Sequence, residues 1–577
     1  MLGATETADA RKDQGMDKKA LLPITDDDLL LQRAYHWEKT RPNAVYMTQP
    51  LGGGAVRDYT WRQVLDESRR MAAYLKAQNF PEKSAIGILS KNVAQFIMSD
   101  LAIWMAGHVS VALYPTLNAD TVNYILEHSE AKALFVGKLD DWETMKPGVP
   151  EDMLCISYPL SPPNDYPTWD EIVAKTAPIE GSPTREQDDM AILVYTSGST
   201  GRPKGVAHTF ANMARAQRGL IDLIQFSEED RQLSYLPLAH VFERAAVEAA
   251  SLYNGSHVFF AESLDTFAKD LQRARPTVFH SVPRLWLKFQ LGVFAKMPEE
   301  RLAKLIRIPI PGGLIKKKVL GGLGLDQCRM AISGSAPIPP ELIQWYNDLG
   351  LELLEGYAMS ENFAYSHFTR PGEVKPGYVG KPAPGCKVRI SEEGEIQVAS
   401  PCDMTGYYKQ PELSKDAFTE DGYLKTGDRG EELPDGTLRI TGRVKEIFKT
   451  SKGKYVAPAP IENLINADNR IELSCVAGAS YDKPHAVVQL AEGLRARAGD
   501  PSLKSELEPA LQDLLKSVNR EVEAFEQLAF IAVAKDEWVI ENGLLTPTMK
   551  IKRGNLEQHY ADKIEGWYEA KQPVVWE

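Results

Sequence analysis

Tyr195-Thr196-Ser197-Gly198-Ser199-Thr200-Gly201-Arg202-Pro203-Lys204-Gly205-Val206 is the most informative stretch of this chain. It follows Met190 to Val194, an apolar run of strand length. Its glycines and hydroxylated residues let the backbone approach an anion with N–H and O–H donors, and Lys204 adds a positive charge. We interpret it as a phosphate-binding loop, with a flexible Ser/Gly linker as the alternative. The Pro203-Lys204-Gly205 order lacks the Gly-Lys-Ser/Thr of a helix-capping P-loop and predicts a hairpin-like, mobile loop.

Length and composition restrict the class of protein. A chain of 577 residues is expected to form more than one domain. An apolar fraction of 43% and a charged fraction of 25% are typical of a soluble globular protein. The formal net charge of −13 argues against nucleic acid as the main partner. Five scattered cysteines without a C-x-x-C pair indicate a reducing compartment and no structural zinc.

The apolar stretches do not predict a membrane anchor or a leader. The first twenty residues are polar and carry charges of both signs, unlike the apolar core of a signal peptide. The longest apolar stretch, Leu101 to Tyr114, is too short to span a bilayer. We therefore expect a cytoplasmic protein.

The first third of the chain alternates between strand and helix patterns. Segments 84–90, 109–113 and 133–136 read as buried strands, with helices expected at 92–106 and 119–130, whereas 26–79 is expected to be largely helical. This alternation predicts right-handed βαβ units and a parallel sheet covered by helices on both faces. Three later strands are expected to end near Pro283, Pro337 and Tyr357, in small or polar residues. Open α/β sheets bind ligands at such carboxyl ends.

The sequence pattern changes from strand–helix alternation to short strands towards the C-terminus. Short alternating segments at 386–390, 395–398 and 437–441 predict a small antiparallel barrel or sheet. Beyond Arg443, strands at 475–479 and 486–490 and a helix at 502–525 predict a separate domain. The expected fold is therefore α/β, with a flexible N-terminal arm (1–22), a large domain of doubly wound mixed sheets with a β-barrel-like part (23–443) and a small α+β C-terminal domain (444–577).

Glu355-Gly356-Tyr357-Ala358-Met359-Ser360-Glu361 is the second motif. Tyr357 offers a flat face for an adenine, Gly356 permits close backbone approach, and Glu361 is an oxygen ligand suited to Mg²⁺ on phosphates. A structural turn would explain this string by itself. Downstream of a phosphate-binding loop, it favours a nucleotide site.

The two motifs together resemble the signature sequences of the adenylate-forming superfamily, which includes acyl-CoA synthetases, adenylation domains of peptide synthetases and luciferases. The family has Gly-Tyr-Gly-x-Thr-Glu at the second motif, and this chain departs from it at Ala358 and Ser360. The resemblance implies that Thr196 and Glu361 hold Mg²⁺, and that the C-terminal domain is a mobile lid.

Later segments continue the resemblance in the family's order. In Tyr423 to Asp428 it implies that Asp428 binds the ribose hydroxyls. In Gly442 to Glu446 it implies a second ribose contact from Arg443 and a hinge at Lys445. In Thr546 to Arg553 it implies that Lys550 is the essential catalytic lysine.

The candidate site residues follow from these motifs. Those expected to bind ATP or AMP are Thr196, Ser197, Gly198, Ser199, Thr200, Gly201, Lys204, Gly334, Ser335, Ala336, Glu355, Gly356, Tyr357, Ala358, Met359, Ser360, Asp428, Arg443 and Lys550. Those at the hinge or facing CoA are Lys445, Gly453, Lys454 and Tyr455. Those of the acyl pocket are His240, Phe242 and Val282; for His240, a hydrogen-bonded core histidine is the alternative.

The resemblance implies a two-step reaction with ATP, Mg²⁺ and CoA. A carboxylic acid is first converted to an acyl-adenylate with release of pyrophosphate, and then to acyl-CoA with release of AMP. The motifs resemble long-chain fatty acyl-CoA synthetases most, and medium-chain, aryl and other acids stay open. An acyl-AMP ligase that serves a carrier protein, and a non-catalytic fatty-acid uptake or sensing protein, are the alternatives.

Residues 301–320 are locally basic in an acidic protein, with Leu and Ile between the cations. Such a pattern suits anionic headgroups and an incoming fatty-acid carboxylate, so we expect the acyl entrance and a peripheral contact with the inner face of a membrane here. Pro309 and Pro311 exclude one continuous helix through the segment. The alternative is an amphipathic surface helix followed by a loop.

Overall fold

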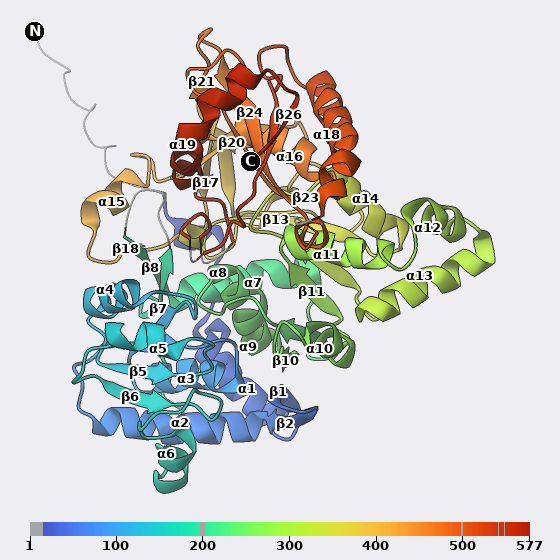
Figure 1. The fold of residues 1–577 in the computed structure, drawn as a ribbon. Helices are drawn as coiled ribbons and strands as arrows, with labels where there is room; N and C mark the ends of the chain where they lie inside the picture. The colour runs from blue at the N-terminus through green and yellow to red at the C-terminus, as the bar shows by residue number, and fades with distance from the viewer. Residues whose placement is uncertain (1–15, 197–201, 498–499, 541, 547–548) are drawn as a thin grey trace, which may run out of the picture.

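The computed structural model describes residues 16–196, 202–497, 500–540, 542–546 and 549–577. They form a large N-terminal domain and a smaller C-terminal domain, the latter coloured orange to red at the top of Figure 1. Of the predicted arm 1–22, only the end from Met16 is described. There Lys18 Nζ lies 2.6 Å from Asp403 Oδ2 and over the Phe418 ring, so this end is anchored on the large domain.

The first sheet of the large domain is mixed, with strand order β18-β8-β7-β4-β3-β5-β6. From β7 to β6 the pairs are parallel, and β8 and β18 add antiparallel strands at one edge. The strands are β18 (Gly406–Tyr407), β8 (Lys204–Thr209), β7 (Met190–Thr196), β4 (Val109–Leu113), β3 (Ala85–Leu89), β5 (Ala133–Val136) and β6 (Leu154–Ser157). Every residue of β3, β4 and β5 is buried, as a parallel sheet covered on both faces requires.

Helices cover both faces of this sheet, as predicted. The chain passes from β3 to its neighbour β4 through α3 (Ala94–Met105), then crosses back to β5 through α4 (Ala119–Ser129). Right-handed crossovers in opposite directions place α3 and α4 on opposite faces. Helix α2 (Trp61–Ala77) packs on α3 and starts with a capping box between Thr60 and Gln63.

The prediction of a largely helical segment at 26–79 is wrong in its middle. Helix α1 (Leu30–Thr40) and α2 flank a hairpin of β1 (Val45–Gly52) and β2 (Ala55–Thr60). Gly52, Gly53 and Gly54 all have positive φ in its turn, a conformation that glycine adopts without strain. β1 also pairs in parallel with β10 (His257–Phe260), which pairs with β9 (Arg231–Ser234). Tertiary pairing therefore overrides the local helical pattern.

A second set of parallel strands lies above the first sheet in Figure 1, next to the C-terminal domain. β11 (Val278–Ser281), β12 (Met330–Ser333) and β13 (Leu353–Tyr357) are parallel, as expected from their carboxyl-terminal motifs. β14 (His367–Phe368) and β15 (Lys381–Pro382) extend the sheet antiparallel. Of the two predicted forms, a barrel or a sheet, the structure has the sheet. It is antiparallel and four-stranded, in the order β16 (Lys387–Ile390), β17 (Glu395–Ala399), β19 (Leu424–Glu432) and β20 (Leu438–Arg443).

Residues 301–320 belong to a helical hairpin that projects from the large domain at the right of Figure 1. Helices α12 (Glu299–Ile306) and α13 (Pro309–Leu323) contact each other. No continuous helix runs through the segment, as predicted. The alternative of a helix followed by a loop is wrong, because Pro309 takes the first position of α13, where its missing N–H costs nothing. Ile308, Ile310 and Leu314 are strongly exposed there.

The C-terminal domain has a sheet β23-β24-β25-β26, formed by β23 (Ile471–Ala477), β24 (His485–Leu490), β25 (Ile531–Val533) and β26 (Val574–Trp576). Neighbouring strand residues alternate between two hydrophobic clusters: Val476 and Val488 pack with α16 (Pro458–Asn466) and α18 (Pro501–Glu521), and Cys475 and Val487 with α19 (Arg553–Ala570). Within the described residues, no hydrophobic cluster contains side chains of both domains.

Candidate active site

A carboxylate, Asp428, joins the second sheet to the antiparallel sheet. Tyr357 Oη, at the end of β13, donates to Asp428 Oδ2 at 2.8 Å, and Arg443 Nε lies 2.9 Å from Asp428 Oδ1. Asp428 and Arg443 are opposite one another in the β19–β20 register. Burial raises the pKa of Asp428 and the Arg443 charge opposes that shift. The predicted adenine and ribose contacts are therefore neighbours.

Lys550 lies in the C-terminal domain, directly before Ile551. Ile551 forms an antiparallel bridge with Leu545, so the chain reverses direction between them, and Met549 has a φ of +61°. Lys550 N donates to Thr546 Oγ1 at 3.0 Å. Arg553 fixes the end of the turn, because its guanidinium donates to Val476 O at 2.8 Å and pairs with Glu462 at 2.8 Å.

Charges of the large domain act on Lys550. Its side chain is exposed, and desolvation by the surrounding protein lowers its pKa, with Arg443 acting in the same direction. The carboxylates of Asp428 and Glu361 oppose this shift. His240, from the predicted acyl element, is half-buried, and desolvation together with the Lys550 charge lowers its pKa to about 3. Both domains thus contribute charges to one site.

Glu361 lies in a 3₁₀ turn, Ser360–Asn362, directly after β13. Its Oε1 accepts a hydrogen bond from Tyr407 Oη at 2.8 Å, and Lys204 Nζ lies 5.1 Å from the centre of the Tyr407 ring. Burial and the Glu361 charge raise the pKa of Tyr407, so its hydroxyl remains a donor. Tyr407 is a residue that the motifs missed, since only its pairing in β18 brings it beside Glu361.

The strands on either side of the predicted phosphate-binding loop form a hairpin, as expected. β7 and β8 are antiparallel, and Thr196 is opposite Lys204 in their register. The hairpin thus places the predicted metal ligand Thr196 beside a lysine. Ser197, Gly198, Ser199, Thr200 and Gly201 lie outside the described residues.

The segment after β12 packs closely against the end of β13. A side chain at Gly334 would lie 3.2 Å from Phe242 and 3.4 Å from Gly356 O, so only glycine fits without displacement. Ser335 follows with a φ of +70°, and Ala336 is exposed. The predicted nucleotide-binding and acyl-pocket residues are therefore in contact at this point.

The structure also places three further residues of the second motif: Glu355, Ala358 and Met359. Glu355 is buried within β13, which raises its pKa to about 8. Ala358 is outside the left-handed region, so the departure from glycine introduces no strain. Met359 N donates to Asn362 Oδ1 at 3.0 Å and thereby closes the turn that carries Ser360 and Glu361.

The predicted CoA-facing residues are not part of this group. Lys445 lies in a 3₁₀ turn, Val444–Glu446, directly after β20. Gly453, Lys454 and Tyr455 follow in the hairpin of β21 (Phe448–Lys449) and β22 (Tyr455–Val456), at the end of the C-terminal domain that faces away from the large domain (Figure 1). Tyr455 is 65% exposed there.

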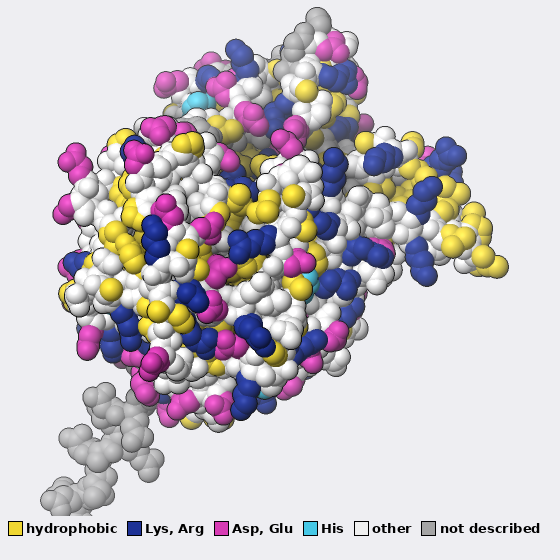
Figure 2. All heavy atoms as spheres, turned by 90° about the horizontal axis from the view of Figure 1, so that it is seen from below, with side chains coloured by type: hydrophobic (Ala, Val, Ile, Leu, Met, Phe, Trp, Pro, Cys, Tyr) yellow, Lys and Arg dark blue, Asp and Glu magenta, His cyan; other side chains and the backbone are white. Residues whose placement is uncertain are grey.

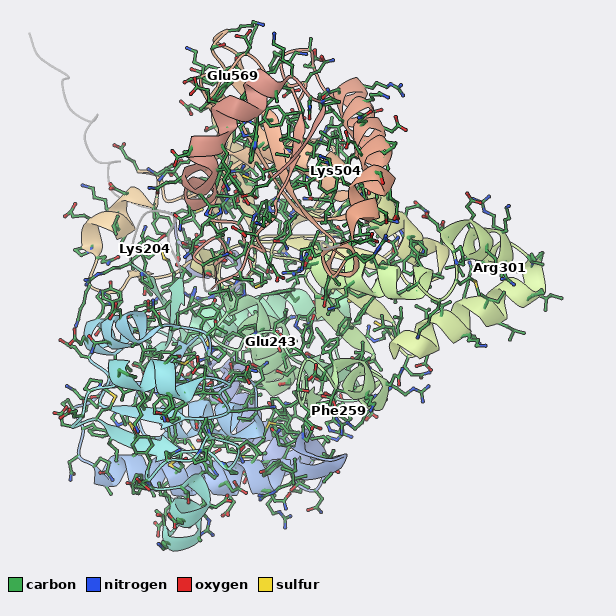
Figure 3. The ribbon with its side chains drawn as sticks, in the orientation of Figure 1. Lys204, Glu243, Phe259, Arg301, Lys504 and Glu569 are labelled. Atoms are coloured by element: carbon green, nitrogen blue, oxygen red, sulfur yellow. The ribbon has the colours of Figure 1, made fainter. Side chains whose placement is uncertain are left out.

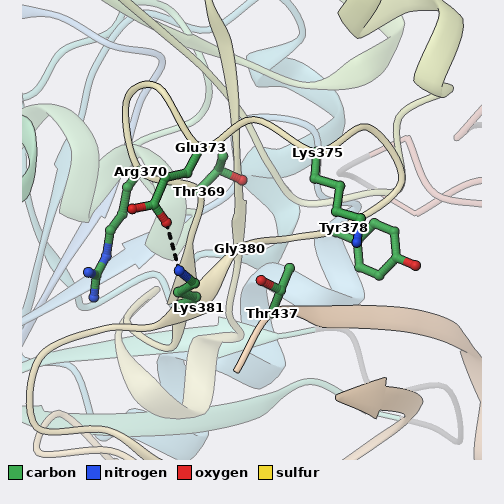
Figure 4. A pocket seen from close by; sticks show the side chains of 8 residues that line it. All are labelled: Thr369, Arg370, Glu373, Lys375, Tyr378, Gly380, Lys381 and Thr437. Atoms are coloured by element: carbon green, nitrogen blue, oxygen red, sulfur yellow. Dashed lines mark hydrogen bonds and ion pairs between the residues drawn. The ribbon is translucent and has the colours of Figure 1, made fainter. Parts of the chain in front are cut away.

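Partly open pockets lie elsewhere in the large domain. One of about 10 Å³ is bordered by Thr369, Arg370, Glu373, Lys375, Tyr378, Gly380, Lys381 and Thr437 (Figure 4). It has room for about one water, which would satisfy the buried, unpartnered Thr369 hydroxyl. Another, of about 240 Å³, lies between the end of α7 (Phe210–Ile224) and the starts of β12 and β13. Neither pocket includes the candidate site residues named above.

Glu361 and Thr196 are the predicted ligands of Mg²⁺. Among the described residues, no group of three or more His, Cys, Asp or Glu side chains could enclose a metal ion. Mg²⁺ is commonly held by one or two protein oxygens together with substrate phosphates. Glu361 and Thr196 fit that kind of site and not a site built from protein ligands alone.

Comparison with protein families gives two matches. Residues 34–408 match the family model described as AMP-binding enzyme, and residues 445–572 match the model described as AMP-binding enzyme C-terminal domain. The peroxisomal long chain acyl-CoA synthetase 6 of Arabidopsis thaliana is 31% identical over 89% of this chain and 82% of its own length. The long-chain-fatty-acid–CoA ligase FadD15 of Mycobacterium bovis is 30% identical over 94% of this chain and 98% of its own.

Solved structures share the fold at lower identity. An anthranilate CoA ligase in complex with anthranoyl-AMP superimposes with a TM-score of 0.77, at 21% identity, over 94% of this chain and all of that one. The adenylation domain of a carboxylate reductase from Mycobacterium chelonae gives 0.78 at 23% identity, over 96% of this chain and 94% of that one.

Proposed function

The chain belongs to the family of AMP-binding enzymes, and from that premise we propose that it is an AMP-forming acyl-CoA synthetase for long-chain fatty acids. Two things carry this: the ion pair of Arg443 with Asp428 at 2.9 Å, and the charges of Arg443, Asp428 and Glu361 acting on the pKa of Lys550 from across the domain boundary. The relatives named as long-chain acyl-CoA synthetases or ligases support the choice of acid and of CoA. The domain boundary near Lys445 and the roles of the site residues are part of this proposal.

Adenylation is the first step. The carboxylate of the acid and the α-phosphate of ATP are both anions, so their approach requires fixed positive charge. Lys550 supplies it from the C-terminal domain. Asp428 accepts the ribose hydroxyls while Arg443 and Tyr357 hold its carboxylate in place. A bond forms between the carboxylate and the α-phosphorus as pyrophosphate leaves.

Mg²⁺ would be held by Glu361 and Thr196 and would neutralise charge on the phosphates. Tyr407 orients Glu361 by donating to its Oε1. Lys204 lies over the same tyrosine ring and would add positive charge for the phosphates of ATP.

Thioester formation requires a different lid orientation. Gly453, Lys454 and Tyr455 face away from the site when Lys550 occupies it. A rotation about Lys445 would withdraw Lys550 and bring that hairpin to the adenylate, where the CoA sulfur attacks the acyl carbonyl and AMP leaves. One site thereby performs two half-reactions. An acyl-AMP ligase would stop short of this step or use a carrier protein.

The hairpin α12–α13 is the proposed contact with a membrane. Arg301, Lys304, Arg307, Lys317 and Lys318 are exposed on it around the apolar Ile308, Ile310 and Leu314. In Figure 2 the projection at the right carries hydrophobic side chains at its tip with cations beside them. Basic residues bordering exposed apolar ones match anionic headgroups with acyl chains beneath. Among the described residues, no helix has the length and apolarity needed to cross a bilayer, so the contact would be peripheral.

The proposed function predicts pyrophosphate release with long-chain fatty acids and formation of acyl-CoA when CoA is present. The panel should include medium-chain and aryl acids and each reaction should be run with and without CoA. Release of pyrophosphate without any thioester would favour the acyl-AMP ligase. No activity with any acid would favour a non-catalytic uptake or sensing protein.

Lys550→Ala should lower adenylation about 100-fold or more, because it removes the charge that meets the α-phosphate. Conversion of supplied acyl-adenylate to acyl-CoA should change little, since Lys550 has left the site in that step. In the wild type, adenylation should fall as the pH rises through the lowered pKa of Lys550, below the ordinary 10.5, because the lysine then loses its charge. Equal losses in both half-reactions would contradict the two-orientation mechanism.

Glu361→Gln should shift the Mg²⁺ titration of adenylation about tenfold or more to higher concentration, because the variant keeps the shape and removes the charge. The control is Glu355→Gln in the same motif. Glu355 has a pKa of about 8 and is mostly protonated at neutral pH, so the amide should leave the titration unchanged. An unaltered titration for Glu361→Gln would exclude it as a metal ligand.

Binding to vesicles containing phosphatidylglycerol should be weakened about 100-fold when Lys316, Lys317 and Lys318 are all changed to Gln, at about 1 kcal/mol per charge. A matched variant changes the exposed Lys175, Lys415 and Lys504 to Gln and should bind as the wild type does. Co-sedimentation measures both. Equal binding by the two triple variants, or none by the wild type, would contradict the membrane contact.

A further inference from the structure

Glu243 is a buried carboxylate to which four donors converge in the middle of the large domain (Figure 3). It ends the short helix α8 (Val241–Glu243), the element that also carries Phe242 and is capped by His240. Oε1 accepts from Ser234 Oγ at 2.8 Å, from Tyr235 N at 3.0 Å and from Asn92 Nδ2 at 3.2 Å. Oε2 faces His280 Nε2 at 2.7 Å. Both carboxylate oxygens are therefore paired, as a buried polar group requires.

These donors belong to separate elements, so the carboxylate fixes their spacing. Ser234 ends β9, His280 lies near the end of β11, and Asn92 precedes α3. α8 is held by a second, independent contact, because the next residue, Arg244, pairs with Asp100 of α3 at 2.6 Å. The Glu243 carboxylate adds the contacts that hold α8 to the carboxyl ends of β9 and β11.

The pair formed by Glu243 and His280 adjoins residues of the predicted acyl pocket. The Phe242 ring meets the His280 ring edge to face, with centres 5.1 Å apart. On another side, Phe242 approaches Gly334, which packs against Gly356 of the second motif. Val282 follows β11 two residues after His280. A shift of His280 would therefore move the two apolar side chains expected to line the acid.

We propose that Glu243 and His280 are positioning residues for the acid substrate. The pair holds α8 against the end of β11, so that Phe242 and Val282 keep the spacing that the acyl chain needs beside the adenylate site. It acts through these two side chains and touches neither the acid nor ATP. The inference rests on the proposed function and adds to it the residues that set affinity for the acid.

A purely structural role predicts a different outcome, because it would lower stability without selecting a substrate. The matched control uses the opposite end of the same strands. Thr277 precedes β11, and its hydroxyl donates to Asp230 beside β9 at 2.6 Å. Thr277→Val removes a hydrogen bond between the same two strands, far from Phe242.

The experiment measures KM for a long-chain fatty acid and KM for ATP in full-length variants, with the unfolding midpoint of each. His280→Leu and Glu243→Gln should raise the KM for the acid about tenfold or more and leave the KM for ATP within about twofold, as expected for loss of a hydrogen bond to a charged group. His280→Gln keeps an N–H donor near the Nε2 position and should recover most of the affinity. Thr277→Val should lower the midpoint only.

An unchanged KM for the acid in both variants, or equal rises for acid and ATP, would overturn the inference. So would a Thr277→Val variant that raises the KM for the acid as much as His280→Leu does. If His280→Leu does not fold, Glu243→Asp, which withdraws the carboxylate by one methylene, replaces it with the same expected result. Failure of the wild type to activate any acid would instead contradict the proposed function.

Discussion

The pairing of Asp428 with Arg443 is the contact on which the geometry of the candidate site depends. It connects β19 to the edge strand β20 of the antiparallel sheet, and the Tyr357 hydroxyl extends it to β13 of the neighbouring sheet. Arg443 is also the last residue before the turn that leads into the C-terminal domain. The same carboxylate thus fixes the proposed nucleotide side of the site and the proposed start of the C-terminal domain.

Charges of both signs act on Lys550 where the two domains meet. Lys550 enters a site where Arg443 repels it and Asp428 and Glu361 attract it. His240 is held neutral by its surroundings and by Lys550, so it adds no further cation. A neutral histidine next to Phe242 suits an apolar substrate better than a charged one. The polar and apolar halves of the site therefore meet between His240 and Lys550.

The sequence allowed the parts of the site that are contiguous motifs to be predicted, together with the parallel strands, whose apolar runs are unbroken. It could not identify Tyr407 or the Glu243–His280 pair, because their partners are 46 and 37 residues away and only strand pairing brings them together. The hairpin β1–β2 was misassigned because flanking helices dominate the local pattern, although three consecutive glycines marked its turn. Helix α13 was missed because Pro309 was interpreted as a breaker and not as a first-turn residue.

The separate hydrophobic cores of the two domains have a consequence for how the lid can move. Contacts across the boundary include the ion pair of Arg284 with Glu472, and Lys288 with Glu492 at 3.2 Å. Water can replace such contacts at little cost, whereas uncovering apolar surface would cost about 25 cal/mol for each Å². In the proposed movement, the C-terminal domain would dissociate from one face and settle on another while each domain keeps its own hydrophobic core buried. Salt concentration, rather than the strength of the hydrophobic effect, then becomes the natural variable that tunes how long each orientation lasts.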